Sequence, residues 1–243
     1  MPDEELWGER VASTYDADCA EMFLPEVIDA TVDFLADLAG ERPALEFAVG
    51  TGRIALPLSA RGVAVAGIEQ SPAMADVLAA KPGADRIPVT IGDMATTRVG
   101  GSFGVVYLVF NTITNLLSQE EQVDCFCNAA AHLDSGGAFV VETFVPALRR
   151  LPSGERFVAF DVSEHHIGVD EYDVVNQVAT SHHHWTGDGR NDVFRSTHRY
   201  AWPAEYDLMA RLAGLTRRER WSDWLRSPFT ADSTSHVSVW EKS

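Results

Sequence analysis

Residues 44–53, ALEFAVGTGR, decide the fold of this chain. They read as an apolar strand that contains a carboxylate near its end and runs into a glycine-rich turn, with a helix predicted over 53–60 behind it. Glycine has no Cβ, so Gly50 and Gly52 tolerate positive φ and let a ligand approach the main chain closely. The turn therefore predicts a site for a nucleotide-like cofactor at the end of this strand.

Around this turn, apolar strands alternate with helical patterns from about residue 25 to 145. The predicted strands are 43–48, 63–68, 87–91, 104–110 and 137–143, and the helices lie near 53–60, 72–80 and 119–133. Such alternation yields a parallel sheet with helices on both faces. A helix at 204–213 is followed by strands at 215–222 and 236–241 with no helix between them, so the last strand pairs antiparallel to its neighbour. We predict a doubly wound, seven-stranded α/β sheet with an antiparallel last strand.

A β-rich segment interrupts this pattern. Pro146, Pro152 and the turn at Gly154 mark a boundary, and the stretches 156–163, 172–185 and 191–202 then read as β-rich. Asp188-Gly189 is a hairpin signal between the last two stretches. We predict a core formed by residues 1–150 and 203–243, with 151–202 inserted as a β-rich lid.

Composition excludes several classes of function. The 19 basic and 36 acidic residues give a net charge of −17, which repels nucleic-acid phosphates and anionic membranes. The 3 cysteines show no structural-zinc spacing and cannot all pair. The N-terminus has no signal-peptide pattern, and no apolar run approaches about 18 residues. We expect a cytoplasmic protein that binds neither nucleic acid nor membranes and holds no metal.

Polar residues follow four of the predicted parallel strands. Glu46 and Glu69 end the first two, Asp93 follows the third, and Asn111 follows the fourth. Ligands of doubly wound sheets bind at these carboxyl ends. Glu69 lies 19 positions after Gly50, where a dinucleotide fold places an acid for the ribose hydroxyls. This spacing supports an adenosine-containing cofactor.

Two kinds of cofactor fit the glycine turn. Residues 50–55, GTGRIA, satisfy the loose fingerprint of nicotinamide cofactors, so an NAD(P)-dependent oxidoreductase is an alternative. Glu46 argues against it, because a carboxylate at the mouth of the turn would face a pyrophosphate. A cofactor with a cationic end is favoured instead.

Three motifs in order, EFAVGTGR at 46–53, GIEQSPAM at 67–74 and GDM at 92–94, make the chain similar to the class I S-adenosylmethionine-dependent methyltransferases. The resemblance spans roughly residues 40–145, and an antiparallel last strand is also typical of that family. Ala48 replaces the first glycine of the usual loop, and alanine tolerates turn positions with φ below zero. The resemblance implies S-adenosylmethionine as cofactor and S-adenosylhomocysteine as product.

The resemblance also implies roles for the loop residues. Glu46 and the backbone from Gly50 to Gly52 would hold the methionine end of the cofactor, and Glu69 would bind the ribose hydroxyls. A carboxylate suits both ammonium and hydroxyl donors. Ala48 and Arg53 belong to the same cofactor-binding set.

The second and third motifs would bind the adenine end of the cofactor. Met74 or Gln70 would lie on or beside the ring, and Met94 would flank it, as a flexible thioether suits a π face. Asp93, after Gly92, would accept a hydrogen bond from the exocyclic amine.

The acceptor end is less well defined. Tyr15 matches a tyrosine that many small-molecule members place over the cofactor, and an ordinary packing role is the alternative. Phe110, Asn111 and Thr112 would line the cleft where the acceptor meets the methyl group. Asn111 is a candidate catalytic residue beside Tyr15, although it could instead only cap the following helix.

The insertion resembles the antiparallel lid of small-molecule N- and O-methyltransferases, including those that act on amino sugars. It would roof the acceptor or form a homodimer contact. Six histidines fall within it, namely His165, His166, His182, His183, His184 and His198. Of the three consecutive ones only His182 and His184 share a strand face, which leaves a zinc site without a third ligand. A general base among the six stays open.

Taken together, the sequence predicts a small-molecule methyltransferase of specialised metabolism that methylates nitrogen or oxygen by in-line displacement. The alternatives are the NAD(P)-dependent oxidoreductase and a methyltransferase-like scaffold or cyclase that does not methylate.

Overall fold

The structure is a computed structural model that describes residues 7–187 and 190–243 and arranges their strands in two sheets. The larger sheet has the order β10-β11-β5-β4-β1-β2-β3. Its strands are β1 (Ala44–Phe47), β2 (Val65–Glu69), β3 (Val89–Ile91), β4 (Phe103–Leu108), β5 (Leu133–Phe144), β10 (Leu215–Trp221) and β11 (Ser235–Lys242). The first five pair in parallel, whereas β11 is antiparallel to both β5 and β10. The predicted fold class is confirmed.

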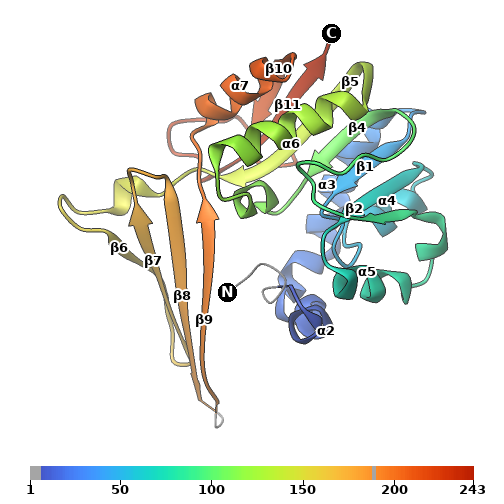
Figure 1. Ribbon diagram of the computed structural model, residues 1–243. Helices are drawn as coiled ribbons and strands as arrows, with labels where there is room; N and C mark the ends of the chain where they lie inside the picture. Colours follow the sequence, from blue (N-terminus) through green and yellow to red (C-terminus); the bar gives the residue numbers. More distant parts are fainter. Residues whose placement is uncertain (1–6, 188–189) are drawn as a thin grey trace.

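Helices cover both faces of the larger sheet (Figure 1). They are α3 (Pro25–Ala39), α4 (Ala55–Ala60), α5 (Pro72–Ala79), α6 (Gln119–His132) and α7 (Pro203–Leu212). Side chains alternate along each strand, so Val106 and Leu108 join the α6 and α7 side, while Val105 and Tyr107 join the α3 and α4 side. The chain therefore has one core on each face of the sheet.

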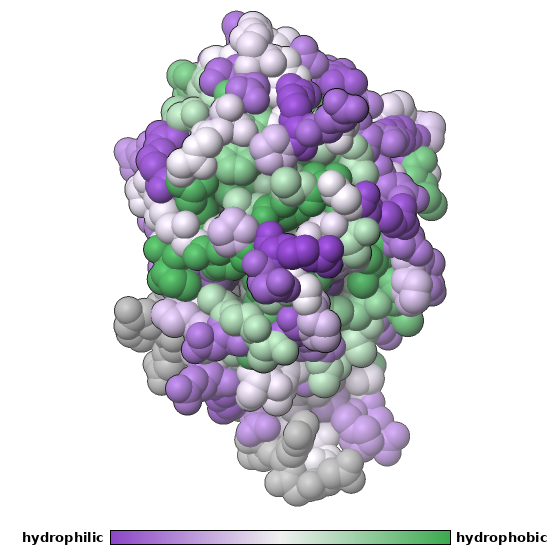
Figure 2. Space-filling view, turned by 90° about the vertical axis from the view of Figure 1, so that its right-hand side faces the viewer, coloured by the Kyte–Doolittle hydropathy of each residue, from purple (hydrophilic) through white to green (hydrophobic). Residues whose placement is uncertain are grey.

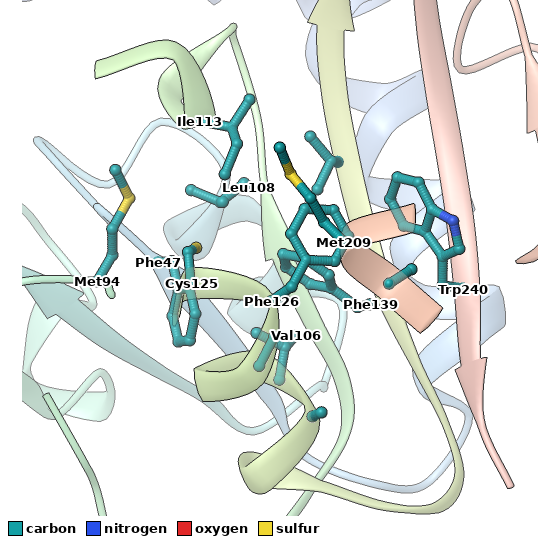
Figure 3. Packing of buried hydrophobic residues seen from close by; sticks show 14 of the residues in the cluster. Phe47, Met94, Val106, Leu108, Ile113, Cys125, Phe126, Phe139, Met209 and Trp240 are labelled. Atoms are coloured by element: carbon teal, nitrogen blue, oxygen red, sulfur yellow. The ribbon is translucent and has the colours of Figure 1, made fainter. Parts of the chain in front are cut away.

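Aromatic rings fill the core beneath α6 and α7. The Phe126 ring lies 4.9 Å from that of Phe139 and 5.1 Å from that of Trp240, both edge-on. Figure 3 shows these three rings together with Met209 of α7. The packing fixes β11 against α6, which holds the antiparallel last strand in place.

The smaller sheet is antiparallel and contains four strands in sequence order (Figure 1). They are β6 (Phe157–Val162), β7 (His166–Asp173), β8 (Val178–Gly187) and β9 (Arg190–Arg199). The predicted β-rich stretch 172–185 spans the end of β7, a turn and most of β8, and residues 166–171 of β7 lie outside the predicted stretches. The hairpin signal Asp188-Gly189 lies outside the described residues, although Gly187 pairs with Arg190 on either side of it. All four strands fall within the predicted insertion, whose boundaries stay a prediction.

Two short helical segments precede the first strand of the larger sheet and pack near the carboxyl ends of its strands. The helix α2 (Glu9–Asp18) and the 3-10 turn η1 (Ala20–Phe23) precede α3, and α2 lies beside α5 (Figure 1). Further 3-10 turns are η2 (Ala84–Arg86), η3 (Thr112–Asn115) and η4 (Leu148–Arg150).

The face at the right of Figure 1 carries hydrophobic residues across its middle (Figure 2). Within residues 7–187 and 190–243, no helix combines the length and apolar character needed to cross a membrane.

Candidate functional site

A cleft of about 520 Å³ opens at the carboxyl ends of β1 to β4 and extends to β8 and β9. Most of the residues predicted from the sequence line it together. These are Tyr15, Ala48, Gly50, Glu69, Gln70, Met74, Gly92, Asp93, Met94, Phe110, Asn111 and Thr112. The structure thus brings the three sequence motifs to one cleft.

Three other predicted residues lie behind the lining. At Gly52, with φ +83°, a Cβ would stand 2.3 Å from Leu78 Cδ1, so glycine is needed there for packing. The Arg53 guanidinium donates to the Met22 carbonyl at 3.2 Å and lies 5.4 Å from the centre of the Phe110 ring. The third is Glu46.

Glu46 is buried at 2% exposure under the turn. Burial raises its pKa to about 8, against the opposing effects of the Tyr107 hydroxyl, Arg53 and the Ala55 N–H. The Tyr107 hydroxyl donates to Glu46 Oε2 at 2.9 Å. At neutral pH the Glu46 carboxyl is therefore protonated in this structure.

Glu69 holds the turn from the neighbouring strand. Its Oε2 accepts the Gly50 N–H at 2.7 Å and its Oε1 accepts the Ser71 N–H at 2.8 Å. Burial raises the pKa of Glu69, whereas these backbone N–H groups lower it. A carboxylate has about four acceptor positions, so each oxygen keeps one for a ligand. This arrangement suits a pair of adjacent hydroxyl donors.

The backbone at Ala48 differs from the expectation. Its φ is +51°, so the predicted φ below zero is wrong. The chain bends sharply after β1 while the Val49 N–H donates to the Ile68 carbonyl at 3.0 Å, and this bond fixes the bend. A non-glycine residue in this region costs about 1–2 kcal/mol. The backbone at Ala48 therefore follows the path of a glycine loop, and the positive φ of this alanine strains the turn.

A second strained turn follows β4, with Phe110 at φ +56° and Asn111 at φ +62°. Glu142 Oε2 accepts the Phe110 N–H at 2.8 Å, and Asn111 Oδ1 accepts the Phe144 N–H at 2.8 Å. The Asn111 side chain makes no capping bond to η3, so the capping alternative is wrong. Its side chain instead ties the β4 turn to β5, because two consecutive left-handed residues need such support.

A polar latch holds α2 over the cleft. Asp16 accepts from Thr51 Oγ1 at 2.6 Å and pairs with Lys81, whose Nζ also donates to the Thr51 carbonyl at 2.8 Å. The latch positions Tyr15, which lines the cleft and whose pKa burial raises to about 12. Tyr15 is thus a neutral hydroxyl at physiological pH.

We expect Asp16→Ala to loosen α2 without unfolding the core. A hydrogen bond to a charged group contributes about 1.5–3 kcal/mol, and partial exposure reduces that value, so amide exchange across residues 9–18 should quicken about tenfold. Hydrogen exchange with mass spectrometry measures this. Asp18→Ala is the control, because the Asp18 side chain accepts from Thr14 Oγ1 within α2 and, in the part of the chain that the structure describes, makes no bond to another element. Equal exchange in wild type and Asp16→Ala would contradict the latch.

Several cleft residues were not assigned to the cleft from the sequence, although His198 is one of the six histidines named there as candidate bases. Trp7 lines the cleft, and its carbonyl accepts from Ser71 Oγ at 2.7 Å. Ser181, Thr197 and His198 reach the cleft from β8 and β9. Strand pairing is needed to find them, because it brings Ser181 of β8 and His198 of β9 to the same face of the smaller sheet.

The charged side chains in the described lining of the cleft are all acidic. Its described lining includes the acidic residues Glu69, Asp93 and Glu121 and neither lysine nor arginine. Among the described residues, no three His, Cys, Asp or Glu side chains gather closely enough to hold a metal ion. The cleft therefore suits a ligand that carries hydrogen-bond donors or positive charge.

Comparison with protein families gives a match over residues 44–137 to the model described as "Methyltransferase domain". Among curated proteins, the chain is 26% identical over 250 residues to the cypemycin N-terminal methyltransferase of a Streptomyces species, with both sequences covered completely. The matched family segment contains the glycine turn, β1 to β4 and the start of β5.

Among solved structures, the CcbJ methyltransferase of Streptomyces caelestis is 37% identical, with a TM-score of 0.86 and 98% of each chain covered. The S-adenosylmethionine-bound amino pentose methyltransferase CalS10 of Micromonospora echinaspora is 21% identical, with a TM-score of 0.71 and coverage of 93% of this chain and 96% of that one. The second likeness is one of fold.

Proposed function

The chain belongs to the class I S-adenosylmethionine-dependent methyltransferases that act on small molecules, and we propose that its acceptor atom is an amine nitrogen of a specialised metabolite. The observation that carries the proposal is the cleft lining, which is acidic and includes neither lysine nor arginine in the described chain. Family membership leaves the oxidoreductase and non-methylating alternatives without support.

The residues of the cleft fit S-adenosylmethionine. Glu69 keeps two acceptor positions for the ribose hydroxyls. Asp93 also lines the cleft, and its Oδ1 accepts the Ala95 N–H at 2.5 Å. The other oxygen, Oδ2, can therefore accept from an adenine amine. At Gly92 a Cβ would lie 2.1 Å from Thr97 Oγ1, so this turn admits only glycine. When bound, the cofactor supplies an activated methyl group on a sulfonium sulfur.

The protein's own contribution is alignment and exclusion of water. The α2 latch places Tyr15 and Trp7 on one side of the cleft, and β8 and β9 supply the opposite wall. Holding two reactants in line supplies much of the rate of such a transfer. The relatives support a nitrogen acceptor, since their names describe an N-terminal methyltransferase and an amino pentose methyltransferase.

The cofactor site is tested by Glu69→Gln. The amide cannot offer charged acceptors to two hydroxyls, so S-adenosylhomocysteine should bind about tenfold to a hundredfold more weakly, equivalent to roughly 1.5–3 kcal/mol. Calorimetric titration measures the affinity. Asp85→Asn, an exposed change of the same kind, should bind as the wild type does. Unchanged affinity in Glu69→Gln would contradict the assignment.

The acceptor class is tested with labelled methyl donor and three probes, which are the dipeptide Ala-Ala, a methyl aminopentoside and catechol. We expect transfer to one or both amines and none to catechol. Transfer to catechol alone would contradict the nitrogen proposal and favour oxygen.

A further inference from the structure

His198 stands in the wall between two clefts. It lies on β9 and lines the cleft described above together with Ser181 and Phe144. The same three residues line a second cleft of about 450 Å³ between the smaller sheet and β5. His198 is half-buried, with its side chain facing both clefts.

Hydrogen bonds around His198 indicate which ring nitrogen carries the proton. Thr114 Oγ1 donates its only proton to the Asn111 carbonyl at 2.7 Å. The same oxygen lies 3.3 Å from His198 Nδ1 and can therefore only accept from it. Nδ1 thus bears the proton, and Nε2, which lies 3.0 Å from Ser196 Oγ, accepts from the Ser196 hydroxyl, so that hydroxyl must turn away before another proton can reach Nε2.

The surroundings keep this ring neutral. Burial lowers the pKa of His198, Asp170 opposes the shift, and His183 adds to it. Charged side chains that line the two clefts around the ring are Glu69, Asp93, Glu121, Asp170, Arg149, Arg150 and Asp232. A neutral imidazole with its lone pair on Nε2 is the form that a general base requires.

We propose that His198 is a catalytic base that removes a proton from the acceptor amine at Nε2, with Thr114 as its positioning residue. This inference rests on the proposed amine acceptor. The pKa is about 8 for an α-amino group and about 10 for a lysine-like amine, so at pH 7 the acceptor enters largely as an ammonium, which has no lone pair to donate to a methyl group.

The proton transfer balances within the described groups. One N–H bond of the ammonium breaks, its electron pair stays on the nitrogen, and a new Nε2–H bond forms on the imidazole. Ser196 can rotate its hydroxyl to accept from Nε2–H, after which the proton passes to water. The Nδ1–H bond to Thr114 keeps the ring in place throughout, as an orienting partner does for other catalytic bases.

The alternative is a structural histidine that only joins β9 to η3. Kinetics with the amine probe that turns over, Ala-Ala or the methyl aminopentoside, separate the two roles. His198→Asn should lower kcat at pH 7 about tenfold for an amine of pKa near 8 and up to about a thousandfold for one of pKa near 10, with recovery as the pH approaches the pKa of the amine. Its affinity for S-adenosylhomocysteine should stay within about twofold of the wild type, since no cofactor contact is lost.

Matched variants complete the kinetic test. Thr114→Val should lower kcat in the same direction, and Thr114→Ser, which keeps the hydroxyl, should restore it. The control His184→Asn changes an exposed ring whose strand position points to the opposite face of the smaller sheet from His198. A His198→Asn rate within about threefold of the wild type, or a pH profile parallel to it, would overturn the proposal.

A second measurement needs no acceptor. Nitrogen-15 spectra of histidine-labelled protein saturated with S-adenosylhomocysteine, with His198→Asn to assign the signal, should show a neutral ring protonated at Nδ1 at pH 7. A ring protonated at Nε2, or charged at pH 7, would overturn the proposal. Failure of both amine probes with intact S-adenosylhomocysteine binding would instead count against the amine acceptor, so the two failures are distinguishable.

Discussion

Glu46→Gln should unfold at a higher temperature than the wild type at pH 8. The folded Glu46 carboxyl keeps its proton up to a pKa of about 8, whereas the unfolded chain releases it near the ordinary value of 4.5. Unfolding therefore releases a proton between these two pH values, and the stability of the wild type falls across that window. Glutamine does not titrate, so the difference in unfolding free energy should grow with pH to at most about 5 kcal/mol.

The same variant should lose cofactor affinity if Glu46 holds the cofactor's ammonium group. Loss of that charge should weaken binding of S-adenosylhomocysteine about tenfold to a hundredfold. In the wild type, binding would release the Glu46 proton, so affinity should improve as the pH rises toward 8.

Thermal unfolding and calorimetry at several pH values measure both effects. Glu41→Gln makes the same chemical change at an exposed position and should alter neither quantity. A Glu46→Gln melting curve that matches the wild type at every pH would contradict the buried, protonated carboxyl. Stabilisation with unchanged affinity would place Glu46 outside the cofactor site.

Arg199→Met should destabilise the protein by about 3–5 kcal/mol, because removal of one partner leaves a charge unpaired in a buried network. Arg199 is 4% exposed and donates to Gln122 Oε1 and Glu205 Oε1, each at 2.6 Å. Gln177, in the turn between β7 and β8, also belongs to this network. Its Nε2 donates to Glu205 Oε2 at 2.7 Å. The network therefore joins the base of the smaller sheet to α6 and α7.

For a chain of this length the expected loss corresponds to about 10 °C in melting temperature. Arg195→Met is the matched control, since Arg195 is exposed on the same strand, and its melting temperature should change little. A loss below about 1 kcal/mol in Arg199→Met, of the size expected for a surface ion pair, would contradict the account.

The α/β core was predictable because each of its signals is local. Strand and helix periods, the glycine turn and the missing helix before β11 lie within short stretches of sequence. The turn between β7 and β8 was missed because Val174 and Val175 look like strand residues, yet they are 57% and 87% exposed. Asp173 makes that turn by accepting the N–H groups of Val175 and Asn176, a bond that the sequence pattern does not reveal.

The candidate site was predictable in part for the same reason. Strand ends and the glycine turn marked Glu69 and Asp93, which the structure places in one cleft. The strain at Ala48 and the tie from Asn111 to Phe144 were not predictable, because both depend on contacts with neighbouring strands. The orientation of His198 depends likewise on Thr114, which is 84 residues away in sequence.

The most direct test of the central claim is calorimetric titration of the purified protein with S-adenosylhomocysteine and, in parallel, with NADH. We expect micromolar binding of S-adenosylhomocysteine and none of NADH, since the acidic cleft suits a cofactor with a cationic end and disfavours a pyrophosphate. Binding of NADH alone, or of neither ligand, would contradict the cofactor site and the function built on it.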